Sequence, residues 1–283
     1  MYEQKPLQEL IAEQIKESDL RLPVFNQVAL RLQQALNDDN LTVDEIEATV
    51  MEDPALASQI LRVANGAFFK GLSQITTIRR AVVRLGAQQV ANLAMVVSQQ
   101  STYASDNKSL SRYMQNLWRH AFATALGSKW VAERCGYIAQ AEVAFLAGLL
   151  HDIGKLVILK VVEKINSGRI ISVPLSDAVI AEALESSMHA EYGYQLMCNW
   201  NLPEQYCLVA HDHHREEFDP SHTLLAIVRL VNQACAKVGI SLRNDANIVL
   251  AASPEAQILG MSEVQLAALE ILLEESIETA KAA

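Results

Sequence analysis

Apolar residues recur at intervals of three and four along most of the chain, which is the period of an amphipathic α-helix. The spacing is clearest in LLAIVRLVNQACAK at 224–237 and in LAALEILLEESIETA at 266–280. Segments with strand-like alternation are few, and the sequence contains no βαβ alternation, no glycine-rich phosphate loop and no repeat of fixed period. The pattern therefore predicts an all-α fold.

The expected helices begin and end at residues suited to those positions. Thr42 with Glu45 has the spacing of a capping box, and Ser262 with Gln265 has the same spacing before the last helix. The other markers are a proline in a first turn or a glycine after a last turn, at Pro54, Pro254, Gly86, Gly136 and Gly260.

Two polar stretches interrupt the apolar pattern. STYASDNKSLSR at 101–112 predicts a division into an N-terminal helical part, 1–108, and a C-terminal helical domain, 109–283. The second stretch, at 165–177, predicts a loop ahead of the helix that bears His189. We expect the last helix to pack on the core or on a partner.

The charge balance argues against one class of partner. The chain has 23 Lys and Arg residues against 33 Asp and Glu residues, a formal net charge of −10. Because this charge repels polyanions, no nucleic-acid partner is expected. Arg79, Arg80 and Arg84 would form a local basic patch, but a solvated helix face explains them better.

The cysteines and the N-terminus indicate a soluble cytoplasmic protein with no membrane partner. Cys135, Cys198, Cys207 and Cys235 are scattered without a CxxC pair, which is typical of reduced thiols, and we expect them in the core. The N-terminal residues mix charges of both signs and lack the apolar region of a signal peptide. No run of about 18 apolar residues occurs.

The candidate chemistry lies in the histidines, all seven of which fall between His120 and His222. Histidine and aspartate are common ligands of transition metals, and the run LLHDIGK places His151 next to Asp152. We expect the helix to end at Gly154, so that both side chains lie in its last turn. The two carboxylate oxygens of Asp152 could then bridge a pair of ions.

Other histidines could reach the same centre. The helix of His120 can turn back antiparallel to the next helix, which would bring His120 to face His151. Gly193 lies one turn after His189 and permits close backbone approach. In HDHH, His211 and His214 are three residues apart and are predicted on one face, with His213 pointing elsewhere, toward a second ion or a substrate phosphate.

Each histidine also has a simpler explanation. His151 could cap a helix end, His120 could be a hydrogen-bonded core residue, and HDHH could be an exposed helix end. Their joint order favours a metal site over these separate roles. His222 fits no part of the pattern and suits a helix start or a surface position.

That order resembles the HD superfamily of metal-dependent phosphohydrolases. His120 matches the first histidine, and His151 with Asp152, followed by IGK, matches the His-Asp pair. The HD-GYP branch adds a lone histidine and a His-His pair, which are here His189, His213 and His214.

The N-terminal half makes the resemblance more specific. The segments at 22–38, 52–69, 75–95 and 117–132 resemble the signature segments of the HDOD family, a bacterial-type signal-transduction relative of the HD domains. The resemblance covers roughly residues 20–240 and implies an HD-like helical bundle in the C-terminal half.

The resemblance implies one or two divalent metal ions, of iron, manganese, zinc or magnesium. Asp152 and Lys155 would be the catalytic residues if the site is active. Either His213 or His214 could be the inner ligand of the pair. The implied ligand set is His120, His151, Asp152, His189, His213 and His214, with Asn232 as an additional ligand.

Two departures from the enzymes change the functional interpretation. Asn232 stands where HD enzymes carry their closing aspartate, and an amide oxygen brings no charge to a divalent cation. The GYP loop is also absent. A basic pocket would have only Lys155, Arg119 and Arg215 to draw on.

We therefore favour a stand-alone regulatory protein with a degenerate metal site, acting by partner interaction or ligand sensing. Its partner would be a signalling protein or a small phosphate-containing ligand, and it could form oligomers. The alternative is a metal-dependent phosphohydrolase that uses a metal-activated water. A purely structural helical scaffold would leave the ordered histidines unexplained.

Overall fold

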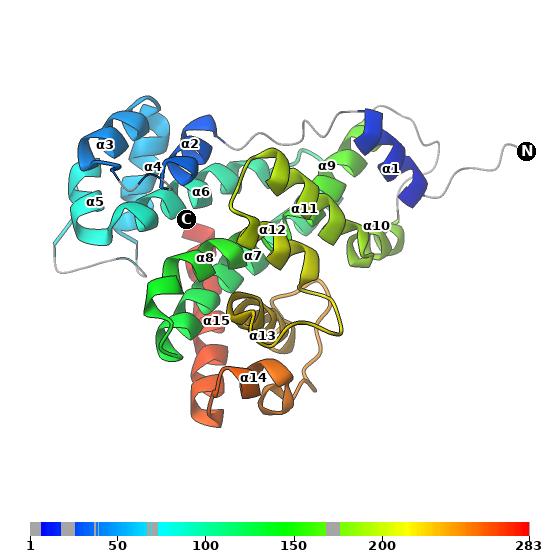
Figure 1. The fold of residues 1–283 in the computed structure, drawn as a ribbon. Coiled ribbons are helices and arrows are strands. Elements are labelled where there is room, and N and C mark those ends of the chain that lie inside the picture. The colour runs from blue at the N-terminus through cyan, green and yellow to red at the C-terminus, as the bar shows by residue number, and fades with distance from the viewer. Residues whose placement is uncertain are drawn as a thin grey trace, which may run out of the picture.

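All regular structure in the described part of the chain is helical, as the apolar spacing predicts (Figure 1). The computed structural model describes residues 7–17, 26–36, 38, 40–66, 69, 73–167 and 176–282. The segment at 22–25 and most of the second predicted loop, 168–175, lie outside these ranges. The all-α prediction is confirmed.

The first group of helices forms one end of the molecule (Figure 1). In this group three helices, α2, α4 and α5, pack on α6. Helix α3 contacts α2, α4 and α5. Its members are α2 (Gln27–Ala35), α3 (Val43–Met51), α4 (Pro54–Ala64), α5 (Ile78–Leu85) and α6 (Ala87–Thr102).

The second group is built on the long helix α7, which runs back against α8 and is also covered by α13 and α15. Helix α11 packs on α9 and α12. Two short 3-10 helices, η1 (Ile138–Gln140) and η2 (Leu250–Ala252), join longer elements. The α-helices are α7 (Lys108–Arg134), α8 (Ala141–Leu150), α9 (Ile153–Ser167), α10 (Asp177–Glu185), α11 (Met188–Asn199), α12 (Glu204–Asp212), α13 (Thr223–Lys237), α14 (Pro254–Ile258) and α15 (Glu263–Ala282).

The division predicted near residue 108 coincides with the short connection between α6 and α7. Helix α1 (Leu7–Glu17) does not lie with the first group, because it packs on α9 and α10 at the opposite end of the molecule (Figure 1). Helix α6 joins the two groups, since it is buried along most of its length and also contacts α8. The division into 1–108 and 109–283 stays a prediction.

The predicted capping boxes and three of the four predicted glycine helix ends are confirmed. Thr42 and Glu45 form both hydrogen bonds of a capping box, and the Ser262 hydroxyl accepts from the backbone N–H of Gln265. Gly86, Gly136 and Gly260 all have positive φ. These caps satisfy backbone groups that a helix end leaves without partners.

The exposure of the cysteines differs in part from expectation. All four are free thiols. Cys207 and Cys235 are buried and Cys135 is half-buried, but Cys198 is exposed near the end of α11, so its prediction as a core residue was wrong. The predicted solvated face of Arg79, Arg80 and Arg84 is confirmed, because all three side chains are exposed.

None of the helices in the described ranges combines the length and the apolar character needed to cross a bilayer.

Helices α9 and α11 approach each other through glycine. Gly154 was expected to end the helix before it, but α8 ends at Leu150 and Gly154 lies in the first turn of α9. A Cβ atom at Gly154 would lie 1.8 Å from the carbonyl oxygen of His189 and 2.8 Å from the backbone nitrogen of Gly193. Only glycine fits there, and the close approach predicted at Gly193 is confirmed.

We predict that Gly154→Ala lowers the free energy of unfolding by about 3 kcal/mol, because backbone atoms cannot move aside as a flexible side chain would. Gly193→Ala is the matched control, since its Cβ would come no closer than 3.3 Å to another atom, the backbone nitrogen of Gly154. Urea unfolding of the two variants measures the difference. Equal losses would contradict this account of the contact.

Candidate metal centre

Five elements bring the predicted ligands to one place. His120 comes from α7, while His151 and Asp152 form the two-residue turn between α8 and α9. His189 lies in the first turn of α11, His213 and His214 directly follow α12, and Asn232 lies on α13. Five of these side chains are almost fully buried, with 3% exposure or less: His120, His151, Asp152, His189 and His213.

The imidazole rings are held by main-chain oxygens. In each of four histidines the Nδ1 atom lies within hydrogen-bond distance of a backbone carbonyl. An Nδ1–H donated to a carbonyl leaves Nε2 as the atom that can bind a metal. The pairs are His120 with Ile240 at 3.0 Å, His151 with Gly148 at 2.8 Å, His189 with Ser186 at 2.6 Å and His213 with Ala210 at 2.8 Å.

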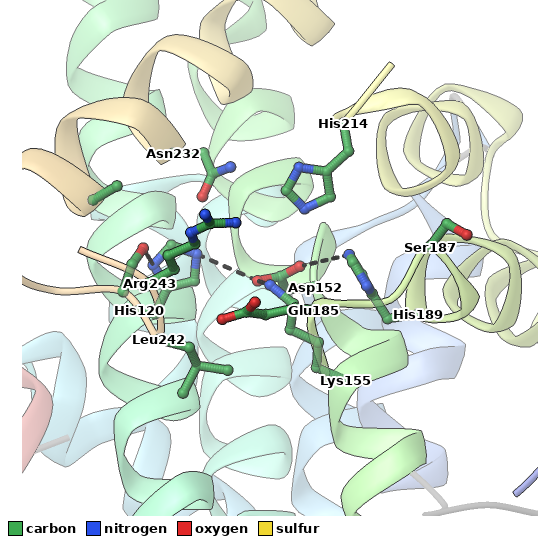
Figure 2. A pocket seen from close by; sticks show the side chains of 12 residues that line it. His120, Asp152, Lys155, Glu185, Ser187, His189, His214, Asn232, Leu242 and Arg243 are labelled. Carbon is green, nitrogen blue, oxygen red and sulfur yellow. Dashed lines mark hydrogen bonds and ion pairs between the residues drawn. The ribbon is translucent and has the colours of Figure 1, made fainter. Parts of the chain in front are cut away.

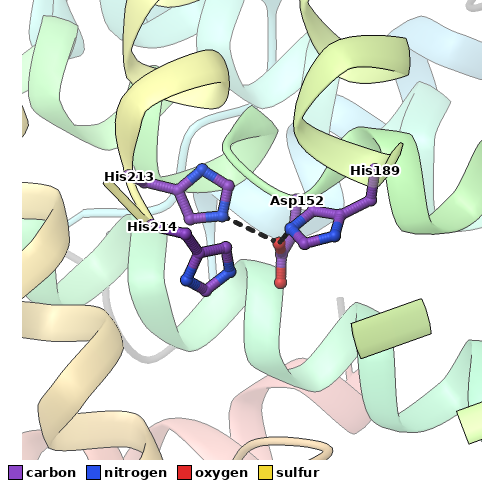
Figure 3. Close-up of side chains that lie close together, drawn as sticks. All are labelled: Asp152, His189, His213 and His214. Carbon is purple, nitrogen blue, oxygen red and sulfur yellow. Dashed lines mark hydrogen bonds and ion pairs between the residues drawn. The ribbon is translucent and has the colours of Figure 1, made fainter. Parts of the chain in front are cut away.

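The Nε2 atoms converge on Asp152, one pair on each carboxylate oxygen. Figure 2 shows His120 and His189 on either side of Asp152, and Figure 3 shows His213 and His189. Those of His189 and His213 lie 3.5 and 3.2 Å from Oδ1. Those of His120 and His151 lie 3.4 and 3.5 Å from Oδ2. Asp152 therefore stands between two sets of possible ligands, as a bridging carboxylate would.

This arrangement fits a bound cation. The Nε2 atom of His189 is buried and makes no hydrogen bond, although it points at Asp152. Imidazole lone pairs that face a carboxylate oxygen repel it unless a cation or a proton lies between them. The ligand atoms of Asp152, His189, His213 and His214 lie within 4.8 Å of one another, as do those of His120, His151 and Asp152.

The HDHH run is arranged differently from the prediction. His213 was expected to point away, but it is buried and contacts Asp152, while His211 pairs with Asp212 and Glu191 on the other side. His214 is more exposed, with its ring centroid 4.0 Å from that of His213 (Figure 3). His213 still has helical backbone angles and donates its N–H to the Val209 carbonyl, so it faces opposite to His211, and the way α12 packs on α11 turns that side toward Asp152.

Burial sets the protonation of two imidazoles. It lowers the pKa of His189 to about 4, a shift that Lys155 and His213 reinforce. Desolvation by the surrounding protein also lowers the pKa of His214 to about 3, although part of the side chain is exposed, and His213 contributes further. Both rings are neutral at pH 7, which is the form that binds a metal.

The opposite shift occurs at His120, and Asp152 stays ionised. Burial opposes the charge on His120, but Asp152 and Cys235 favour it and raise the pKa of the ring to about 9. Burial also opposes the charge of Asp152, yet Lys155 and the surrounding histidines hold the pKa of its carboxyl well below the usual value. The Lys155 Nζ atom lies 2.7 Å from Asp152 Oδ2.

A cavity of about 450 Å³ opens beside the cluster (Figure 2). Arg243 and Glu185, which the sequence analysis did not single out, add a second cation and a carboxylate to its wall. Arg119 and Arg215, the other basic residues considered, do not line it. The lining consists of His120, Asp152, Lys155, Glu185, Ser187, His189, His214, Asn232, Ala236, Ser241, Leu242 and Arg243.

No sequence pattern marks Arg243, because it lies in the connection after α13. That connection is fixed to the cluster by His120, whose Nδ1 lies 3.0 Å from the Ile240 carbonyl and 3.2 Å from the Ser241 hydroxyl.

Arg229 is a second residue that the sequence analysis missed. Its guanidinium donates to the carbonyl oxygens of His213 and Arg215, pairs with the buried Glu255 and lies over the Phe218 ring. The backbone that carries His213 and His214 is thereby tied to α13 and α14. His222 occupies the residue before α13, as the predicted helix-start role requires.

The protein is a helical bundle that closes around a buried histidine-aspartate pair. The chain belongs to the HDOD domain family, which it matches over residues 22–216.

Solved structures share the fold. An HDOD domain protein of unknown function from Geobacter sulfurreducens has a TM-score of 0.72 and 22% identity, covering 98% of this chain and 96% of its own. A candidate metal-dependent phosphohydrolase from Shewanella amazonensis has a TM-score of 0.70 and 17% identity, covering 97% and 98%. A candidate signal-transduction protein from Marinobacter aquaeolei has a TM-score of 0.61 and 22% identity, covering 99% and 60%.

One curated relative is longer than this chain. An uncharacterized protein of Treponema pallidum (strain Nichols) is 26% identical over 222 residues, which are 74% of this chain and 42% of the relative. The chain thus spans less than half of that protein.

We predict that metal-free protein loses stability on both sides of about pH 6.5. A histidine in the unfolded chain titrates near 6.5. Because the pKa of His189 is lower in the folded state, its contribution to folding stability is fully present above pH 6.5. This contribution, on the order of 3 kcal/mol, is lost as the pH falls toward 4. The raised pKa of His120 stabilises below 6.5, and its contribution is lost as the pH rises toward 9.

Urea unfolding across this range, in the presence of a chelator, measures the effect. His189→Gln should make the acid limb shallower, with the contribution of His214 remaining, and leave the alkaline limb unchanged. His222→Gln, outside the cluster, is the matched control and should keep both. An acid limb that is the same in His189→Gln and in the parent would contradict the assignment.

Proposed function

We propose that this HDOD protein is a regulatory module in which a divalent metal ion organises a pocket for a small phosphate-containing ligand. The observation that carries the proposal is the convergence of Nε2 atoms on Asp152 from histidines whose Nδ1 atoms are held by main-chain oxygens. The candidate ligands fall in two groups that share Asp152, one with His120 and His151 and one with His189, His213 and His214, and Asn232 is an additional candidate.

The donor set indicates which metal would bind. Imidazole nitrogens outnumber carboxylate oxygens, which favours iron or zinc over magnesium. Bound there, such an ion supplies positive charge for an anionic ligand and lowers the pKa of a bound water.

The charges of the cavity support an anionic ligand. Lys155 lies beside Asp152, and Arg243 lines the same cavity from a different element. Two cations on separate walls can contact one phosphate group from two sides. Glu185 and Ser187 line the cavity too, and can accept hydrogen bonds from hydroxyl or amine groups of the ligand.

The regulatory interpretation is supported by Asn232. This residue lines the cavity from α13, at the position where the HD enzymes carry an aspartate. A neutral amide there leaves Asp152 as the only carboxylate in both candidate ligand groups of the described residues. The alternative function, metal-dependent phosphohydrolysis with Asp152 and Lys155 as catalytic residues, is favoured by the contact between them.

A signal from the pocket would have a route to the first helix group. Gln99 of α6 donates to the carbonyl oxygen of Leu149, two residues before His151. Asn92 of the same helix donates to the backbone and side chain of Glu142 on α8. We propose that residues 1–108 present a surface to a signalling partner and that 109–283 sense the ligand.

The ligand part of the proposal is tested with inorganic phosphate. We expect phosphate to raise the melting temperature of the metal-loaded protein, and Arg243→Ala to weaken its binding about tenfold, the value of one charge-assisted hydrogen bond. Arg80→Ala, on an exposed helix face, is the matched control. No effect of phosphate, or equal effects of the two variants, would contradict the pocket's assignment.

The choice between regulator and enzyme is tested with bis(p-nitrophenyl) phosphate. We expect the metal-loaded protein to hydrolyse it no faster than Asp152→Ala does. Hydrolysis that is present in the parent and lost in Asp152→Ala would instead establish the phosphohydrolase alternative.

A further inference from the structure

The metal cluster consists of two halves that share Asp152 but differ in charge. The Oδ1 half is the group of Asp152, His189, His213 and His214, in which His189 and His213 face Oδ1. The Oδ2 half is the group of Asp152, His120 and His151, in which both rings face Oδ2. The difference between the halves bears on how many ions the protein can hold.

The Oδ1 half offers a cation four ligand atoms and no competitor. Among the described residues, the groups that lie near Oδ1 are the Nε2 atoms of His189 and His213. His189 Nε2 is buried without a hydrogen bond, so its lone pair is available. His214, on the cavity wall, completes the set from a position that an ion can reach.

The Oδ2 half already has a cation. The Lys155 ammonium lies 2.7 Å from Oδ2, within hydrogen-bond distance, and its side chain is only 13% exposed. A divalent ion that bound Oδ2 would have to displace this ammonium or lie beside it. Either event is unfavourable, because like charges repel strongly where water is largely excluded.

Asn232 carries no negative charge that could offset the repulsion between a second ion and the Lys155 ammonium. It lines the cavity as a neutral side chain, so the Oδ2 half shares one carboxylate with its neighbour and has none of its own. A second divalent ion would bring two positive charges to a place with no unshared negative charge.

We propose that the protein holds one metal ion per chain, in the Oδ1 half, with the Lys155 ammonium as the second cation of the cluster at Oδ2. The inference rests on the proposed function in that it requires the cluster to bind metal at all. Lys155 acts here as a positioning residue, because it fixes Asp152 Oδ2 and leaves Oδ1 for the ion.

The location of the ion is tested by removing one ligand from each half. His214→Gln should weaken Mn²⁺ binding about 100-fold, because even the loss of a group that only supports the metal ligands lowers metal affinity by about 10- to 100-fold. His120→Gln should change the affinity less than about threefold. His211→Gln, next to the cluster but directed away from it, is the matched control. His214 is exposed, so its substitution is compatible with folding, which circular dichroism checks.

The number of ions is measured by elemental analysis and by the electron paramagnetic resonance of bound Mn²⁺. We expect one equivalent and the spectrum of an isolated ion for the parent chain. The double variant Lys155→Met with Asn232→Asp removes the competing cation and adds a carboxylate, and it should bind two equivalents with a spin-coupled spectrum.

The outcomes separate the two proposals. A parent chain that binds no Mn²⁺, Fe²⁺ or Zn²⁺ would overturn the proposed function itself. A parent that binds two equivalents, or one whose ion is lost in His120→Gln and kept in His214→Gln, would overturn the one-ion inference alone. A double variant that still binds one equivalent would show that Lys155 and Asn232 are not what excludes a second ion.

Discussion

The negative charge of Asp152 is the constraint on which the second helix group depends. The side chain is 2% exposed, and an isolated ionised carboxylate at such a position costs roughly several kcal/mol. The structure offsets that cost with Lys155 and with imidazoles from three separate helical regions. Because His120, His189 and His213 reach Asp152 from different parts of the chain, the charge ties α7, α11 and the end of α12 to the start of α9.

The backbone around this charge is correspondingly tight. Asp152 lies in a two-residue turn, and the first turn of α9 after it touches the backbone of α11 through Gly154. The contact brings the carbonyl of His189 against α9, so the same glycine that permits the packing also sets how far His189 stands from Asp152. The contact of Gly154 with α11 therefore sets both the packing of α9 on α11 and the position of His189 in the cluster.

Much of this arrangement could be predicted from the sequence because it depends on local patterns. The helices, their caps and the set of histidines around Asp152 follow from spacing and from order along the chain. The sequence does not show which histidine of HDHH faces Asp152, since that depends on how α12 packs on α11 and not on spacing within the run. Arg243 and Arg229 were missed because their contacts join segments that no sequence spacing relates.

The carbonyl groups that hold the histidines have a consequence for how such a site can vary. In three cases the carbonyl belongs to the residue three positions earlier, namely Gly148, Ser186 and Ala210, and contributes no side-chain chemistry. The rings are therefore aimed by the course of the backbone, and the three positions differ in how much change they tolerate. Ser186 is half-buried, whereas Ala210 is fully buried and a Cβ atom at Gly148 would lie 2.6 Å from the Thr124 carbonyl oxygen. An altered backbone at a helix end would disorganise the cluster even where every histidine is retained.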